Sequence, residues 1–106
     1  MDGMVKNKWV GALRSSDYEQ GRQQLCDGER FCALGVLCDT LGLGFSVLSD
    51  GRRAYRDRDG YRDSRVFPMH VSEEIGLAGI EISDIAKMND EGRTFGEIAD
   101  YIEREL

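Results

Sequence analysis

Three cysteines, at positions 26, 32 and 38, are of the residue type most often used for zinc binding and thiol redox chemistry. Zinc ligands usually come in pairs about two to four residues apart and need a fourth ligand, whereas five residues separate each cysteine here from the next. On a helix, Cys32 and Cys38 lie about 240° apart around the axis, so they cannot share one ion or one disulfide. The spacing predicts buried cysteines without a metal, and Cys26 is the only candidate for a reactive thiol.

General acid–base catalysis is a second possibility, because the single histidine, His70, precedes two glutamates, Glu73 and Glu74. The chain has no glycine-rich phosphate loop and no recognisable set of nucleophile and base around this histidine. A solvated or helix-capping role is the interpretation that the pattern favours for His70. We therefore do not expect an enzyme.

Asp57, Asp59 and Asp63 surround Gly60 and share some features with a calcium-binding loop. An EF-hand loop, however, has its glycine at another position and ends in a glutamate, where this chain has Pro68. We expect neither calcium nor another metal, and no cofactor.

The segment 52–65 carries six arginines, three aspartates and two tyrosines. Guanidinium groups beside aromatic rings are typical of sites that hold phosphates and bases. The segment could therefore bind a nucleotide-type small molecule, or it could be a solvated hairpin whose aspartates offset the arginines in weak surface ion pairs. In the first interpretation the ligand-binding residues are Arg52, Arg53, Tyr55, Arg56, Arg58 and Tyr61.

The last part of the chain has the opposite charge, with ten acidic and three basic residues between positions 66 and 106. Such an acidic surface could imitate the phosphates of DNA and occupy a basic groove on a nucleic-acid-binding protein. A solvated acidic helix face is the alternative interpretation. The residues assigned to a partner-binding face are Asp90, Glu91, Glu97, Asp100 and Glu103.

The elements that must position these residues can be predicted from apolar periodicity and capping signals. Asp2 is a helix N-cap that precedes an apolar helical face. Asp27-Gly28 predicts a hairpin turn between two very short strands, at 23–26 and 29–31. From Phe31 onward, apolar residues cover most of a helix circumference, so this helix is expected to be buried.

The second half predicts a small antiparallel meander followed by helices. Residues 45–48 have the composition of a strand, and Asp50-Gly51 and Asp59-Gly60 mark two further turns. Three helices are then expected. The first runs from Pro68 towards Gly76, and a connector over 77–81 follows it. The second covers residues 82–89 and is capped by Ser83, and the third begins with the Thr94–Glu97 capping box.

Length and composition fit one domain over residues 1–106, with 41% hydrophobic and 32% charged residues and no apolar run long enough to cross a bilayer. The first residues lack the apolar core of a secretory signal, and an odd number of cysteines suits a reducing compartment, so the expected location is the cytoplasm. The expected fold is a small α+β domain, mostly helical with about four helices, and a short antiparallel hairpin or meander.

Four pieces of sequence appear in order along the chain: KWVGALRSSDYEQGRQQL, FCALGVLCD, EEIGLAGI and IAKMNDEGRTFGEIADYIE. Their patterns, W-x-x-A-L-R-S, C-x-L-G-V-L-C-D and N-D-x-G-x-[ST]-F-x-E-I-A, resemble a family of small, largely uncharacterised proteins of bacteriophages, prophages and their hosts. The resemblance implies an origin on a phage or other mobile element. It supplies no catalytic residue, and the arginine segment lies where the family looks most variable.

Charge pattern and resemblance lead to two functional hypotheses. The first is a phage-encoded accessory binding protein that inhibits a host defence protein or complex, as an anti-CRISPR-type inhibitor does, by blocking it with an acidic surface in the host cell cytoplasm. The second is a sponge that sequesters a nucleotide immune signal through segment 52–65, as a homo-oligomer because one hairpin encloses little ligand. Neither hypothesis involves direct nucleic-acid binding or a membrane.

Overall fold

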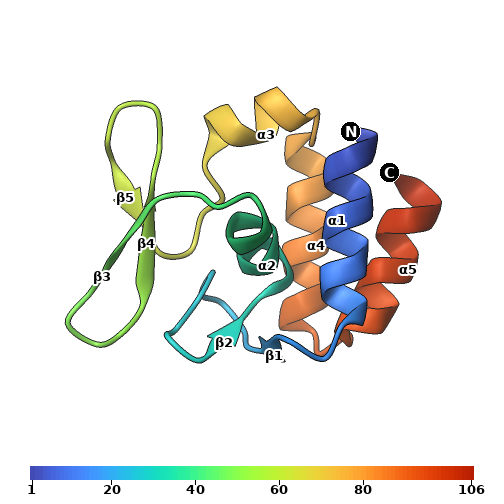
Figure 1. The fold of residues 1–106 in the computed structure, drawn as a ribbon, viewed down its shortest axis with the longest axis horizontal. Coiled ribbons are helices and arrows are strands. Elements are labelled where there is room, and N and C mark those ends of the chain that lie inside the picture. The colour runs from blue at the N-terminus through green and yellow to red at the C-terminus, as the bar shows by residue number, and fades with distance from the viewer.

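The computed structural model describes residues 1–106 as five helices and five short strands. The elements, in chain order, are α1 (Gly3–Arg14), β1 (Glu19–Gln20), β2 (Arg30–Phe31), α2 (Ala33–Thr40), β3 (Phe45–Val47), β4 (Arg53–Arg56), β5 (Arg62–Asp63), α3 (Met69–Ile75), α4 (Gly79–Asp90) and α5 (Phe95–Glu105). Helices α1, α4 and α5 stand together at one end of the molecule, α2 lies between them and the sheet, and β3, β4 and β5 form the opposite end (Figure 1). The predicted α+β fold is confirmed, with five helices where about four were expected.

The ends of α1 and α5 follow the capping signals of the sequence. At the start of α1, Asp2 Oδ1 accepts a hydrogen bond from the Val5 N–H at 2.9 Å. At the start of α5, Thr94 Oγ1 accepts the Glu97 N–H at 3.1 Å, and Glu97 Oε1 accepts the Thr94 N–H at 3.1 Å. Each helix buries an apolar stripe, and the two helices pack against each other. Both predictions are confirmed.

Helix α4 begins earlier than the sequence indicates, at Gly79 instead of residue 82. The carboxylate of Glu81 accepts the Ala78 N–H at 2.8 Å and so satisfies one of the free N–H groups at the helix start. The predicted connector over residues 77–81 and the predicted cap at Ser83 are therefore wrong. Ser83 lies inside α4 and is exposed.

The segment before α2 also differs from the prediction. The turn at Asp27-Gly28 is present, since Gly28 has a positive φ of 106° and the Asp27 N–H donates to the Arg30 carbonyl at 3.0 Å. The strand expected over 23–26 is absent, and only Cys26 forms an isolated antiparallel bridge, with Phe31. Gln23 has a φ of 66°, which is incompatible with an extended strand. Strand β2 pairs instead with β1, in parallel.

Helix α2 forms the centre of the core, and its residues from Ala33 to Cys38 are all buried. The helix begins at Ala33 instead of Phe31 because Cys32 has an extended backbone, and its Sγ accepts the Gly35 N–H at 3.4 Å as a cap. All three cysteines are free and buried. Cys26 is fully buried and burial raises the pKa of its thiol, so the prediction that Cys26 is a candidate reactive thiol is wrong.

Two buried polar side chains hold the first residue of α2. The indole Nε1 of Trp9 donates to the Ala33 carbonyl at 2.8 Å, and Asn89 Oδ1 accepts the Ala33 N–H at 3.0 Å. The Asn89 amide nitrogen also donates to the Gly21 carbonyl at 2.8 Å. Asn89 therefore connects α4, the start of α2 and the segment after β1.

The predicted meander is confirmed as the antiparallel sheet β3–β4–β5. Its two turns contain Gly51 and Gly60, whose φ values of 92° and 83° favour glycine. Pro68 precedes α3, and Gly76 ends that helix in the left-handed conformation, as the sequence indicates.

Candidate functional site

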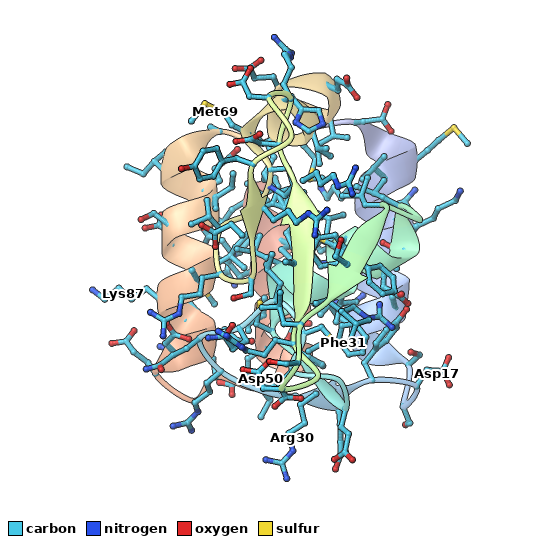
Figure 2. The ribbon with its side chains drawn as sticks, turned by 90° about the vertical axis from the view of Figure 1, so that its left-hand side faces the viewer. Asp17, Arg30, Phe31, Asp50, Met69 and Lys87 are labelled. Carbon is cyan, nitrogen blue, oxygen red and sulfur yellow. The ribbon has the colours of Figure 1, made fainter.

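The sheet divides the arginine segment between two faces. Tyr55 lies opposite Phe45 on β3 and opposite Asp63 on β5, whereas Arg56 lies opposite Arg62. Because successive residues of a strand point to opposite sides, these two sets are on opposite faces of the sheet. We call the Tyr55 side the inner face, because Tyr55 belongs to the core, and the Arg56 side the outer face. Figure 2 looks at the molecule from the sheet end, with the helices behind the strands.

Arg53 is part of the inner face and is held by protein groups. Its guanidinium carbon lies 4.1 Å from the ring centroid of Phe45 and 5.1 Å from that of Phe31. Its Nη1 is 3.1 Å from Asp39 Oδ1, at the end of α2. Only 23% of the Arg53 side chain is exposed. Arg53 therefore connects the sheet to α2 and is not free to bind a ligand.

Tyr55 is the second inner-face residue of the predicted ligand set, and it is 1% exposed. Burial raises the pKa of its phenol to about 12. Its ring packs on Phe45, with the two centroids 5.7 Å apart. Tyr55 is thus a core residue rather than an exposed stacking surface.

Arg56 and Arg62, on the outer face, are both exposed, and neither forms an ion pair. Arg52 is partly held, because its Nε donates to Asp50 Oδ2 at 2.6 Å and its Nη1 lies 3.3 Å from Ser64 Oγ. Arg58 lies beyond β4, 3.7 Å from Glu73 of α3. Of the predicted set, Arg56, Arg58 and Tyr61 are the exposed members.

A hollow of about 400 Å³ lies between the β4–β5 hairpin and α3, and we refer to it below as the hollow. Three large apolar side chains on its rim are exposed: Tyr61 (78%), Val66 (63%) and Met69 (71%). Met69 lies at the end of the molecule where α3 meets the sheet (Figure 2). Four carboxylates and one guanidinium form the charged part of the lining: Asp57, Asp59, Asp63, Glu73 and Arg58.

His70 also lines the hollow, from the first turn of α3. Its Nδ1 is buried and has no hydrogen-bond partner in the protein. The expected solvated or capping role therefore does not describe this nitrogen, which neither contacts water nor caps a helix.

The acidic residues predicted to form a partner-binding face are largely engaged with other residues of the chain. Arg14 of α1 bonds to Asp100 at 2.8 Å and also contacts Glu103. Glu97 belongs to the capping box, and its hydrogen bonds with Thr94 lower the pKa of its carboxyl. Asp90 Oδ1 accepts the Gln23 N–H at 3.1 Å. Among the five assigned residues, Glu91 alone has an exposed carboxylate without a partner in the chain.

Nowhere in residues 1–106 do three or more histidine, cysteine or acidic side chains converge closely enough to hold a metal ion. None of the helices has both the length and the apolarity that a bilayer span requires.

Sequence reasoning missed the part of the hollow that α3 contributes. Val66 and Met69 flank Phe67-Pro68, and apolar residues beside a proline break gave no sign that they would be exposed. Strand alternation separates Arg56 and Arg62 from Tyr55, but this separation can be read only once the register of β4 and β5 is known.

Comparison with known proteins gives one match. Residues 1–64, more than half of the chain, match the model of a protein family described as Domain of unknown function (DUF8296). The match includes α1, α2 and the β4–β5 hairpin, and it ends before α3. No curated protein and no solved structure matches the chain. The chain belongs to the DUF8296 family.

Proposed function

We propose that this protein acts by binding a partner protein through the hairpin surface, which consists of the hollow and its rim residues Tyr61, Val66 and Met69. The supporting observation is that three large apolar side chains, each more than 60% exposed, line the same concave surface. Tyrosine, methionine and arginine are enriched where proteins meet, and a concave apolar patch with a polar rim is typical of an interaction site.

The other exposed apolar residues do not form a comparable group. Met4 belongs to α1 and Ile80 to α4, and they line no hollow together. Phe45 and Val47, on β3, are 42% and 66% exposed, but neither lines the hollow, and the guanidinium of Arg53 stacks on the ring of Phe45. The hairpin surface is therefore the best supported contact surface on the molecule.

The proposed partner is a host defence protein or complex, and the proposed role is inhibition by protein–protein blocking in the host cell cytoplasm. The support for this partner is the resemblance to proteins of bacteriophages and prophages. Asp100 and Glu103 of α5 form ion pairs with Arg14, so their charges are already offset and they are less suited to bind a basic partner. The hairpin surface, and not the acidic face of α5, is therefore the proposed blocking surface.

A second candidate function is the binding of a nucleotide-type anion on the outer face of the sheet. Like charges directly opposite each other on adjacent strands are unfavourable, yet Arg56 and Arg62 occupy such a pair without any carboxylate partner. Guanidinium groups on two neighbouring strands could bind one phosphate together. Arg53 and Tyr55 take no part in this candidate site, because they are packed in the core.

The experiment that tests the first proposal compares two matched pairs of substitutions. Tyr61→Ser with Met69→Ser removes the apolar rim, while Met4→Ser with Ile80→Ser removes equally exposed apolar side chains elsewhere. Both proteins are expressed in a bacterium that carries defence systems, which is then challenged with a defence-sensitive phage. We expect the first pair to abolish phage rescue and the second to preserve it.

The outcome that excludes the hairpin surface is equal rescue by both pairs, with circular dichroism showing that both remain folded. Native mass spectrometry of each protein after incubation with host extract separates the two candidate functions. A retained polypeptide supports the first, and a retained mass of nucleotide size, lost in Arg56→Ala with Arg62→Ala, supports the second.

A further inference from the structure

The hollow is lined mainly by negative charges, although segment 52–65, which supplies about half of its lining, carries a net positive charge. Segment 52–65 has an excess of arginine, but the hollow is lined by four carboxylates and one guanidinium. The cause is strand alternation, which turns Arg56 and Arg62 to the outer face, while Asp63 shares the inner face with Tyr55. Glu73 of α3 adds a carboxylate from the other side.

Each carboxylate of the lining retains oxygen atoms that could accept further hydrogen bonds. Asp57 uses only Oδ1, which accepts the N–H groups of Asp59 and Tyr61 at 2.9 and 2.8 Å. Asp63 likewise uses only Oδ1, to accept two N–H groups of the following turn. Glu73 lies 3.7 Å from Arg58, and both side chains are more than 60% exposed. These contacts leave most of the negative charge of the hollow without compensation.

The apolar rim lies beside these carboxylates. The ring of Tyr61 and the side chains of Val66 and Met69 offer surface to an aliphatic stem, and an aromatic face also attracts a guanidinium or ammonium group. The volume of about 400 Å³ is in the range of sites that enclose a small group. A metal ion fits the hollow less well than a basic side chain does, since no three acidic side chains converge as metal ligands do.

We propose that the hollow receives an arginine or lysine side chain of the partner protein, whose charged head contacts the carboxylates and whose aliphatic stem packs on Tyr61, Val66 and Met69. This inference rests on the proposed function, because it names the chemistry of the partner at the same surface. The argument for this occupant is charge complementarity together with the exposed apolar rim.

The test uses two small probes of nearly the same shape, the positively charged N-acetyl-arginine methylamide and the neutral N-acetyl-citrulline methylamide. Each is titrated into the isotope-labelled protein and followed by NMR. We expect saturable shifts of the signals of Tyr61, Val66 and Met69 with the arginine probe and none with the citrulline probe. Equal shifts with both probes, or shifts that are not confined to the hollow, overturn the inference.

Two variants of the protein, each with one carboxylate replaced by an amide, test the same charge interaction. Asp59→Asn and Glu73→Gln are suitable because neither carboxylate holds a turn, unlike those of Asp57 and Asp63. Each should weaken binding of the arginine probe by about threefold to fivefold. Glu91→Gln, an exposed acid on another part of the molecule, should leave the affinity unchanged. Unchanged affinity in all three variants overturns the inference.

The same variants distinguish this inference from the proposed function. If Tyr61→Ser with Met69→Ser abolishes phage rescue but Asp59→Asn with Glu73→Gln does not alter it, the hairpin surface binds the partner without a basic side chain, and the inference fails alone. If the arginine probe binds in the hollow but rescue is insensitive to the rim substitutions, the proposed function fails while the chemistry of the hollow stands.

Discussion

The side-chain oxygen of Asn89 accepts the backbone N–H of Ala33 at 3.0 Å, although 56 positions separate the two residues. Asn89 is 1% exposed, and its amide nitrogen donates to the Gly21 carbonyl while its oxygen also accepts Gln20 Nε2 at 3.2 Å. One side chain thus satisfies groups on α2 and on the segment after β1. Residues from three of the sequence pieces quoted above meet at this side chain, which therefore connects those pieces in the fold.

Replacement of Asn89 by alanine should destabilise the protein strongly. The Ala33 N–H and the Gly21 carbonyl would lose their partners, and leaving buried polar groups unsatisfied costs on the order of 2–4 kcal/mol in total. Asn89→Asp should also destabilise, because it removes the donor to Gly21 and buries a charge. Urea denaturation of both variants measures the effect. Glu91→Ala, at an exposed residue whose carboxylate has no partner in the chain, is the control, and an equal loss in all three would contradict the assignment.

Gly35 provides a second prediction, because a Cβ atom at this position would lie 1.6 Å from the backbone oxygen of Leu25. Gly35→Ala should therefore cost about 3 kcal/mol, the upper end of the usual range for overpacking, since α2 would have to move away from that segment. Gly11→Ala, in α1, is the matched control, as nothing lies within 4 Å of its added Cβ. That variant should gain about 1 kcal/mol from helix propensity. Thermal unfolding of both proteins measures the two changes in stability. A Gly35→Ala protein as stable as the natural protein would show that Gly35 does not lie so close to Leu25.

Arg53 and Arg56 are separated by only three positions in sequence, but they should respond differently to substitution. Arg53→Lys should destabilise by about 1–2 kcal/mol, because lysine cannot reproduce the planar stack on Phe45 together with the bond to Asp39. Arg56→Lys should change stability by less than about 0.5 kcal/mol, as expected for an exposed position. Chemical denaturation of both variants is the measurement. Similar effects of the two substitutions would mean that Arg53 is not a structural residue.

The elements that could be predicted from the sequence are those set by local signals. The capping residues Asp2 and Thr94 and the glycines of the meander turns all act within a few positions of the chain. The start of α4 was missed because Ala78 has no capping side chain, and the Glu81 carboxylate alone supplies the bond.

The candidate site could be predicted only in part, because its character depends on long-range pairing. Whether an arginine of segment 52–65 faces the core or the solvent depends on the register of β4, and the sequence alone does not define that register. The acidic hollow additionally needs α3, whose Glu73 and Met69 meet the hairpin only in the folded protein. The ion pairs between Arg14 and the acids of α5 likewise require α1 to pack on α5.

Two tyrosines, the partly buried Tyr18 and the buried Tyr55, predict a dependence of stability on alkaline pH. The pKa values of Tyr18 and Tyr55 are raised to about 12, mainly by burial, from the ordinary value of 10.0. The folded protein therefore holds protons that the unfolded chain releases above about pH 10, so stability should fall as the pH rises from about 10 towards 12. Urea denaturation at several alkaline pH values should show a shallower decline for Tyr55→Phe than for the natural protein. The buried thiols contribute in the same direction to both proteins, so parallel declines would contradict the raised pKa of Tyr55.

Arg14 supplies a test of which acidic surface matters for binding. Its side chain is 42% exposed and contacts Asp100 and Glu103, so Arg14→Gln should cost no more than about 1 kcal/mol and should leave the acidic surface of α5 more negative. If the partner bound to the α5 acids, this variant would bind it more tightly at low salt, because less charge would be offset. Because we assign binding to the hairpin surface, we expect unchanged phage rescue and an unchanged amount of retained host polypeptide in native mass spectrometry. Tighter retention in Arg14→Gln, reversed by Asp100→Asn with Glu103→Gln, would transfer the contact surface to α5.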